Sequence, residues 1–200
     1  ISIRWVLISS LASGVSKAQN LLMSEDVLAS IEAIKKLGAK VIVKKNICKI
    51  HGMGMKGYKY KKNLVINAQN SGTLGRLISG ILIDTPFPIK IIGDKSLSKR
   101  DFKRIAKPLS KFGASFHLNN NRNLPLIIKG SQKLKPIKFF ENKGSAQCKS
   151  SIIFGGIKAD GKTIIKAKKS RNHTELLLKY LKLPILSLIH ISEPTRRYRI

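Results

Sequence analysis

The spacing of hydrophobic residues along the chain switches repeatedly between the period of a helix and that of a strand. The clearest helix follows Ser24, where apolar residues recur on one face until Gly38 ends the pattern. Ser24 is expected to cap this helix, and Gly38 to adopt the left-handed conformation that stops it. The other elements predicted for this part are a helix at 4–12 and strands at 18–23, 41–43 and 47–50.

The same order of elements recurs further along the chain. The second copy is predicted as a strand at 64–66, a helix starting near Gly72, a strand at 89–92, a helix at 100–112, and strands near 116 and at 126–128. The third copy is predicted to start with a helix at 149–157, followed by a strand at 163–166 and a helix at 174–181. An internal repeat of this kind predicts an α/β fold in which each unit packs a sheet against helices.

The segment 67–76 (NAQNSGTLGR) joins a predicted strand to a predicted helix. Backbone N–H groups in such a turn, with the positive end of the helix behind them, can bind a small anion. Gly72 lacks a Cβ, so an anion could approach the backbone closely there. Asn70 and Ser71 could instead cap the helix while Gly72 eases the turn, and the spacing alone leaves both interpretations open.

The chain carries a formal net charge of +29, from 39 Lys and Arg residues against 10 Asp and Glu residues. Such an excess is typical of nucleic-acid-binding proteins, and a basic RNA-binding domain is one hypothesis. Tyr58 and Tyr60 alternate with lysines at 56–62, as in a base-stacking platform, although a solvated strand edge would give the same pattern. Lys, Ile and Asn are abundant together, as AT-rich codons produce. We therefore interpret much of the charge as surface composition, and the rest as suited to anionic substrates.

Neither a disulfide framework nor a metal-binding cluster is predicted, because Cys48, Cys148 and the histidines are isolated in the sequence. No stretch approaches the apolar length of a membrane span, and serines interrupt the apolar run at the start, so no signal peptide is predicted. We expect a cytoplasmic protein that needs no metal and no cofactor.

Four motifs occur in order: NAQNSGTLGR at 67–76, GDKSLSKR at 93–100, GSAQCKS at 144–150 and SRNHTE at 170–175. Together they resemble 5-enolpyruvylshikimate-3-phosphate (EPSP) synthases, although Asn172 replaces an acidic residue common in the last motif. The resemblance implies an α/β fold of repeated βαβαββ units forming one domain of an inside-out α/β barrel, truncated here, in an enzyme that is monomeric at full length. It also implies transfer of the enolpyruvyl group of phosphoenolpyruvate to shikimate 3-phosphate, releasing phosphate, in the shikimate pathway to chorismate and aromatic amino acids.

The resemblance assigns binding residues as well. Those implied for shikimate 3-phosphate are Arg4, Ser145, Ala146 through its backbone, Gln147, Ser170 and Arg171. Those implied for phosphoenolpyruvate are Asn70, Gly72, Arg100 and Gln147, so that Gln147 would touch both substrates. The helices starting near Gly72 and Arg100 are expected to point at one cleft that also holds Ser145 and Arg171. No catalytic residue is implied within the chain, because the family's lysine would precede Ile1 and the others belong to a second domain, so we expect no turnover by this chain alone.

Simpler interpretations exist for the same residues. Arg4 could be solvated at a helix start, Ser145 and Gln147 could form an N-cap with a polar first turn, and His173 is more often structural than a catalytic base. Two other functions stay open at this point. One is a related enzyme that adds enolpyruvyl to UDP-N-acetylglucosamine, and the other is the basic RNA-binding domain.

The predicted organisation is one EPSP synthase-like N-terminal domain over residues 1–185, incomplete at its start. Residues 186–200 are predicted to be a non-native tail that belongs to no domain. The reason is that 186–196 resembles the translation of a transposon-type sequencing adapter.

Overall fold

The computed structural model describes residues 1–183 as an alternation of helices and short strands. In chain order the elements are α1 (Ser2–Leu11), β1 (Val15–Gln19), α2 (Glu25–Lys36), β2 (Lys40–Lys44), β3 (Ile47–His51), β4 (Leu64–Asn67), α3 (Gly72–Ile81), the 3-10 helix η1 (Leu82–Asp84), β5 (Ile89–Ile92), α4 (Lys95–Ser98), α5 (Lys103–Ser110), β6 (Ser115–Asn119), β7 (Asn123–Lys129), β8 (Lys138–Glu141), α6 (Ala146–Gly156), β9 (Ile164–Ala167) and α7 (His173–Tyr180). No helix in this described part is long and apolar enough to cross a membrane.

The strands of residues 1–183 form three sheets with one shared topology. Their orders are β1-β3-β2, β4-β5-β7-β6 and β8-β9. β4 pairs in parallel with β5, as β8 does with β9. β7 lies antiparallel between β5 and β6, as β3 does between β1 and β2. The predicted repeat is therefore confirmed, and the second unit displays the whole βαβαββ order.

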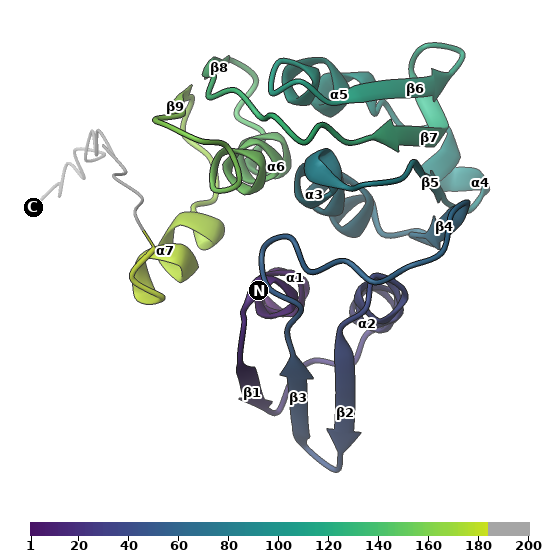
Figure 1. The fold of residues 1–200 in the computed structure, drawn as a ribbon, viewed down its shortest axis with the longest axis vertical. Coiled ribbons are helices and arrows are strands. Elements are labelled where there is room, and N and C mark those ends of the chain that lie inside the picture. Colours follow the sequence, from purple (N-terminus) through teal and green to yellow (C-terminus); the bar gives the residue numbers. More distant parts are fainter. Residues whose placement is uncertain (184–200) are drawn as a thin grey trace, which may run out of the picture.

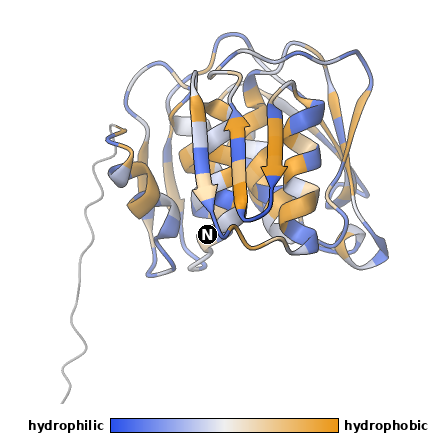
Figure 2. Ribbon diagram, turned by 90° about the horizontal axis from the view of Figure 1, so that it is seen from below, coloured by the Kyte–Doolittle hydropathy of each residue, from blue (hydrophilic) through white to orange (hydrophobic). Residues whose placement is uncertain are grey.

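Helices α1, α2, α3 and α6 lie toward the centre of the molecule, with the sheets β1-β3-β2 and β4-β5-β7-β6 outside them, as in an inside-out α/β fold (Figure 1). α3 packs against α6 and also contacts α1, α2 and α5. Leu7, Ile34, Leu77 and Phe154 from these inner helices are fully buried. In a view over β1, β3 and β2, the hydrophobic segments of the helices lie behind the sheet (Figure 2). Burial of apolar helix faces is the main source of stability in such an arrangement.

The contact between α3 and α6 is especially close. A Cβ placed on Gly80 would lie 2.1 Å from the carbonyl oxygen of Ser151, so only glycine allows the two backbones to meet there. The hydroxyl of Ser151 donates to the carbonyl of Arg76 at 2.8 Å, one turn earlier on α3. These contacts fix the spacing and the relative slide of the two helices.

Gly38 and Gly113 end the corresponding helices of the first two units. Their φ angles are +115° and +114°, in the region that favours glycine. The predicted helix stop at Gly38 is confirmed. Ser24 occupies the predicted N-cap position of α2, but its side chain makes no capping hydrogen bond.

Several predicted elements need correction. The helix predicted at 100–112 is shorter: α5 starts at Lys103, where the Asp101 carboxylate accepts from Arg104 N, and ends at Ser110. A separate helix that was not predicted, α4, precedes it and is capped by Asp94. Arg100 lies between them. The strand predicted at 18–23 is β1, which ends at Gln19. The third unit starts with a strand, β8, and α6 starts at Ala146 because Ser145 caps it. The predicted tail at 186–200 lies outside the described residues.

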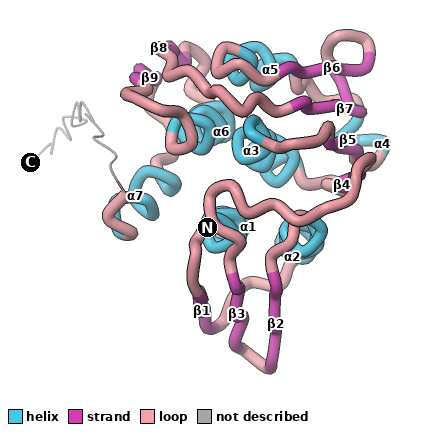
Figure 3. The backbone as a smooth tube through the Cα atoms, viewed as in Figure 1, coloured by secondary structure: helices cyan, strands magenta, loops and turns pink. Residues whose placement is uncertain are grey.

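The connection at 52–63 between β3 and β4 carries no helix or strand (Figure 3). A solvated strand edge is therefore wrong for this segment. Its tyrosines turn toward the protein, since the Tyr58 hydroxyl donates to the carbonyl of Ile81 at 2.7 Å and the Tyr60 hydroxyl to that of Phe87 at 2.7 Å. The two rings are thus engaged within the fold, in edge-to-face contact with each other.

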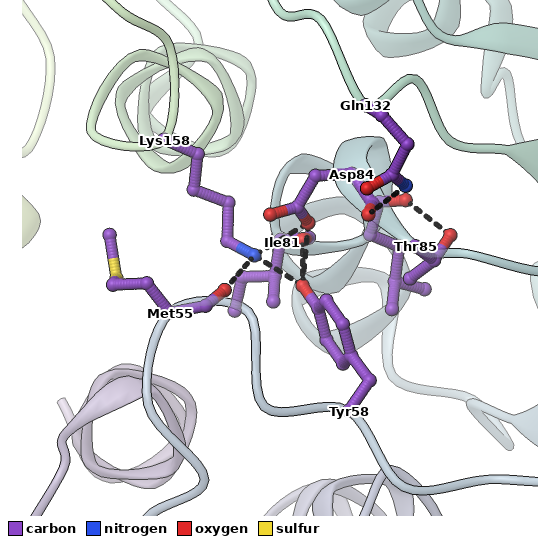
Figure 4. Close-up of polar contacts among 8 residues, drawn as sticks. Met55, Tyr58, Ile81, Asp84, Thr85, Gln132 and Lys158 are labelled. Carbon is purple, nitrogen blue, oxygen red and sulfur yellow. Dashed lines mark hydrogen bonds and ion pairs between the residues drawn. The ribbon is translucent and has the colours of Figure 1, made fainter.

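A buried ion pair joins this connection to the second and third units (Figure 4). Lys158 Nζ, just after α6, lies 2.7 Å from Asp84 Oδ1 in η1, and the two side chains are only 1% and 4% exposed. The ammonium also donates to the carbonyl of Met55 at 2.8 Å and to the Tyr58 hydroxyl, which bonds Asp84 as well. Burial lowers the pKa of Lys158, while Asp84 opposes that shift. The cluster joins the 52–63 connection, η1 and the end of α6, and both of its charged side chains are buried.

We predict that Lys158→Met lowers the free energy of unfolding by about 3–5 kcal/mol, because it leaves the Asp84 carboxylate buried and unpaired. The double variant Asp84→Asn/Lys158→Met should recover most of the loss, because no charge then remains buried. Urea unfolding measures both, with Lys111→Met on the exposed surface as the control, where about 0.5 kcal/mol or less is expected. Equal stability of Lys158→Met and Lys111→Met would contradict the prediction.

Candidate functional site

A cavity of about 480 Å³ opens where the starts of α1, α3, α5, α6 and α7 meet. Its lining is polar and basic and consists of Arg4, Thr73, Arg76, Arg104, Gly144, Ser145, Ala146, Gln147, Ser170, Arg171 and His173. Among residues 1–183, no aspartate or glutamate belongs to this lining. The composition suits a ligand that carries several negative charges.

The N-terminus of α6 forms one wall of the cavity. Ser145 Oγ accepts from Cys148 N at 3.3 Å and so caps the helix. Behind the cap, the Glu141 carboxylate accepts from Ser145 N at 2.7 Å and from Lys143 N at 3.2 Å, which holds the preceding turn. The first turn of α6, with Ala146 and Gln147, thereby presents its positive end to the cavity. The capping interpretation of Ser145 is confirmed, and it is compatible with a binding role.

Gln147 bridges α6 and α3 across the cavity. Its side-chain oxygen accepts from Arg76 Nη1, and its side-chain nitrogen donates to Thr73 Oγ1 at 2.9 Å. The Arg76 guanidinium also lies 5.5 Å from the centre of the Phe102 ring. Both ends of the amide are therefore fixed, so that Gln147 is held in one orientation before any ligand arrives.

A second polar group adjoins the cavity on the far side of Arg76. Arg100 Nη2 donates to Asn70 Oδ1 at 3.0 Å, and Asn70 Nδ2 donates to Asp94 Oδ2 at 2.6 Å. A Cβ on Gly72 would lie 3.0 Å from Arg100 Nη1 and 3.7 Å from Arg76 Nη1. Ser71 Oγ caps α3 by accepting from Leu74 N at 3.2 Å. Ser71 is thus the cap, while the missing side chain of Gly72 leaves room for two guanidinium groups.

Arg4 is held from behind by α7. Its Nε donates to Thr174 Oγ1 at 2.7 Å, and the Thr174 hydroxyl is also 2.7 Å from that of Ser150 on α6. Burial lowers the pKa of Arg4, the nearby Glu175 raises it, and Arg171 lowers it further. The interpretation of Arg4 as a freely solvated residue is therefore wrong.

Positive charge in the site exceeds what the protein itself neutralises. Burial lowers the pKa of Arg76, and the neighbouring charges of Arg104 and Arg100 lower it further. Arg76 Nε and Ser170 Oγ are buried without a hydrogen-bond partner among residues 1–183. Unpaired buried donors are costly, so an anionic ligand with several acceptor oxygens would stabilise this arrangement.

The structure brings the predicted site residues together. Arg4, Ser145, Ala146, Gln147, Ser170 and Arg171 all line the cavity. Asn70, Gly72 and Arg100 lie outside its lining but are contiguous with it through Arg76. The helix expected near Arg100 is α5, which starts at Lys103 and contributes Arg104 to the lining, whereas Arg100 itself precedes this helix and approaches through its side chain. The roles assigned to these residues stay predictions.

Sequence reasoning did not assign five of the lining residues to the site: Thr73, Arg76, Arg104, Gly144 and His173. Arg76 lies one helical turn after Gly72, so the helical period could have placed it on the same face. Thr73 carries no comparable signal. Arg104 follows Arg100 by four residues, so the helix predicted at 100–112 would place both on one face. That reason would have been wrong, because Arg100 precedes α5.

Comparison with known proteins identifies relatives over almost the whole chain. The model of the family described as EPSP synthase (3-phosphoshikimate 1-carboxyvinyltransferase) matches residues 1–189. A 3-phosphoshikimate 1-carboxyvinyltransferase of Caldicellulosiruptor bescii is 43% identical over 182 residues, which are 90% of this chain and 42% of that protein. One from Streptococcus mutans is 41% identical over 181 residues, again 90% of this chain and 42% of the relative.

Solved structures agree with the sequence relatives. An EPSP synthase from Acinetobacter baumannii superposes with a TM-score of 0.83 at 36% identity, covering 89% of this chain and 40% of that one. The chain thus spans about 42% of the length of the curated relatives it matches.

We predict that Ser145→Ala lowers the free energy of unfolding by about 1 kcal/mol, because α6 loses its cap. Ser145→Asn retains an acceptor oxygen at the same position and should lose less. Urea unfolding of the two variants beside the wild type tests the assignment. An alanine variant as stable as the wild type would show that the cap contributes nothing.

Proposed function

The chain belongs to the EPSP synthase family, and from this premise we propose that it binds and orients the substrates of enolpyruvyl transfer. In that reaction the enolpyruvyl group of phosphoenolpyruvate passes to the 5-hydroxyl of shikimate 3-phosphate, giving EPSP and phosphate. The observation that carries the proposal is the arginine-lined cavity joined through Gln147 and Arg76 to the Gly72–Arg100 group. Two adjoining cationic sites suit two anionic substrates that must meet.

Shikimate 3-phosphate is assigned to the cavity. Arg4 and Arg171 supply charge for its phosphate and carboxylate, and planar guanidinium groups suit both through paired hydrogen bonds. The N-terminus of α6 adds the Ser145 hydroxyl and the Ala146 N–H, and Ser170 contributes a buried hydroxyl that has no partner within the described chain. Binding of this ligand would satisfy donors that are otherwise unpaired.

Phosphoenolpyruvate is assigned to the adjoining group. Arg100 provides the charge and Gly72 leaves the space, while Asn70 orients the guanidinium by accepting its hydrogen bond. Gln147 lies between the two sites and would contact both ligands. We assign these residues to binding and orientation and not to proton transfer, because amide side chains do not ionise and a guanidinium group serves as a fixed hydrogen-bond donor.

Other readings receive less support. The relatives are named for shikimate 3-phosphate chemistry, which favours that acceptor over UDP-N-acetylglucosamine. Tyr58 and Tyr60 are engaged within the fold, which weakens the case for an RNA-stacking platform at 56–62. We further propose a cytoplasmic location, in keeping with two buried free cysteines among residues 1–183, and a monomeric full-length enzyme.

Calorimetry with shikimate 3-phosphate tests the assignment of the cavity. We predict measurable binding by the wild-type chain and a loss of about 10-fold or more in affinity for Arg171→Ala, since a charge-assisted hydrogen bond is removed. Lys169→Ala, an exposed neighbour that removes the same charge, is the matched control. Phosphate release with both substrates is followed in parallel, and we expect none from this chain alone. Equal affinities of the two variants would remove Arg171 from the site, and turnover at a normal enzymatic rate would refute the expectation of inactivity.

Gly72→Ala tests the adjoining site. The added methyl group would displace the Arg100 guanidinium, so we predict that phosphoenolpyruvate no longer shifts the Arg100 side-chain signals in an NMR titration into the millimolar range. Affinity for shikimate 3-phosphate should change by less than about 2-fold, and stability should be equal or up to about 1 kcal/mol higher, as for Gly→Ala at an unstrained position. Unchanged phosphoenolpyruvate shifts in this variant would exclude Gly72 from the binding surface.

A further inference from the structure

Arg104 is a pocket arginine with no role in the scheme above. It lies in the first turn of α5, where its N–H donates to Asp101 Oδ1 at 3.3 Å. Its carbonyl accepts from the Cys148 thiol at 3.4 Å, and burial raises the pKa of that thiol to about 11, so that it stays protonated. These two contacts fix the start of α5 beside the first turn of α6, and the Arg104 side chain lines the cavity next to it.

The guanidinium of Arg104 is free to bind a ligand. Arg4 bonds Thr174, Arg76 bonds Gln147, and Lys149 is paired with Glu175 at 2.5 Å. Arg104 makes no side-chain hydrogen bond and no ion pair within residues 1–183. Its charge nevertheless acts on the site, because it lowers the pKa of Arg76. An arginine held in place by its backbone, with an unpaired head group in a cavity, is prepared to receive an anion.

We propose that Arg104 binds the phosphoryl group of the acceptor together with the N-terminus of α6, and so selects a phosphorylated acceptor over an unphosphorylated one. The two partners complement each other: the helix end offers N–H groups and a positive dipole, and the guanidinium offers two parallel donors and a full charge. The inference rests on the proposed function for the identity of the acceptor. The presence of a phosphate site beside Arg104 does not depend on the proposed function.

The test compares shikimate 3-phosphate, shikimate and inorganic phosphate as ligands of the 200-residue chain, by calorimetry and NMR titration. Arg104→Gln removes the charge and the paired donors, whereas Arg104→Lys keeps the charge alone. Lys107→Gln is the control, because it removes one positive charge from the exposed side of the same helix. Circular dichroism and urea unfolding establish that each variant is folded, and Arg104→Lys remains informative if the glutamine variant is not.

Arg104→Gln should weaken shikimate 3-phosphate binding by about 10-fold or more and shikimate binding by less than about 2-fold. Arg104→Lys should fall between the glutamine variant and the wild type, and Lys107→Gln should match the wild type. Inorganic phosphate should lose affinity in parallel with shikimate 3-phosphate. Equal losses for shikimate and its phosphate, or equal effects of Arg104→Gln and Lys107→Gln, would overturn the proposal.

The outcomes distinguish a failure of the role of Arg104 from a failure of the proposed function. If the wild type binds shikimate 3-phosphate and Arg104→Gln binds it equally well, the role of Arg104 is refuted and the proposed function stands. If the wild type binds only inorganic phosphate, in an Arg104-dependent way, the phosphate site stands and the assigned acceptor is wrong. If the wild type binds neither, both are refuted.

Discussion

The close approach of α3 and α6 at Gly80 is the constraint on which the site depends. With no side chain at this point, the backbones of the two helices meet, and the Ser151 hydroxyl bonds the carbonyl of Arg76. One turn closer to the helix starts, the same contact brings Gln147 within reach of Thr73 and Arg76. A larger residue at Gly80 would separate the helices, and the contact of Gln147 with Thr73 and Arg76 would be lost.

Several groups at the site are supported by a second layer of contacts. Thr174 holds Arg4, Glu141 holds the turn before α6, and Asp94 holds Asn70, which in turn orients Arg100. The acids therefore lie behind the binding surface, bonding backbone N–H groups and amides, and leave the arginines facing inward. Such an arrangement keeps the geometry fixed without neutralising the charge that a ligand would meet.

The large positive charge of the chain is divided between two kinds of residue. Arginines occupy the cavity, where fixed planar donors match phosphate and carboxylate groups. Lysines predominate on the exposed surface, where a flexible hydrated ammonium needs no partner, and Lys149 and Lys158 are buried only because Glu175 and Asp84 pair with them. Net charge alone therefore says little about what this protein binds, because the position of each cation decides its role.

The sequence alone determined the repeat, the α/β class and most helices, because hydrophobic periodicity and glycine stops such as Gly38 and Gly113 act locally. The inside-out arrangement was implied by the resemblance of the four motifs to a known family. The sequence also identified Arg4, Ser145, Gln147 and Arg171, since these residues lie in motifs that could be compared with a known family. The short helix α4, which Asp94 caps, was missed, and α5 was predicted to start three residues too early. Three contacts join residues distant in the sequence: Gln147 with Arg76, Arg104 with α6, and Lys158 with Asp84. Only tertiary packing decided them, because side chains from separate units meet there and no local pattern encodes which will touch.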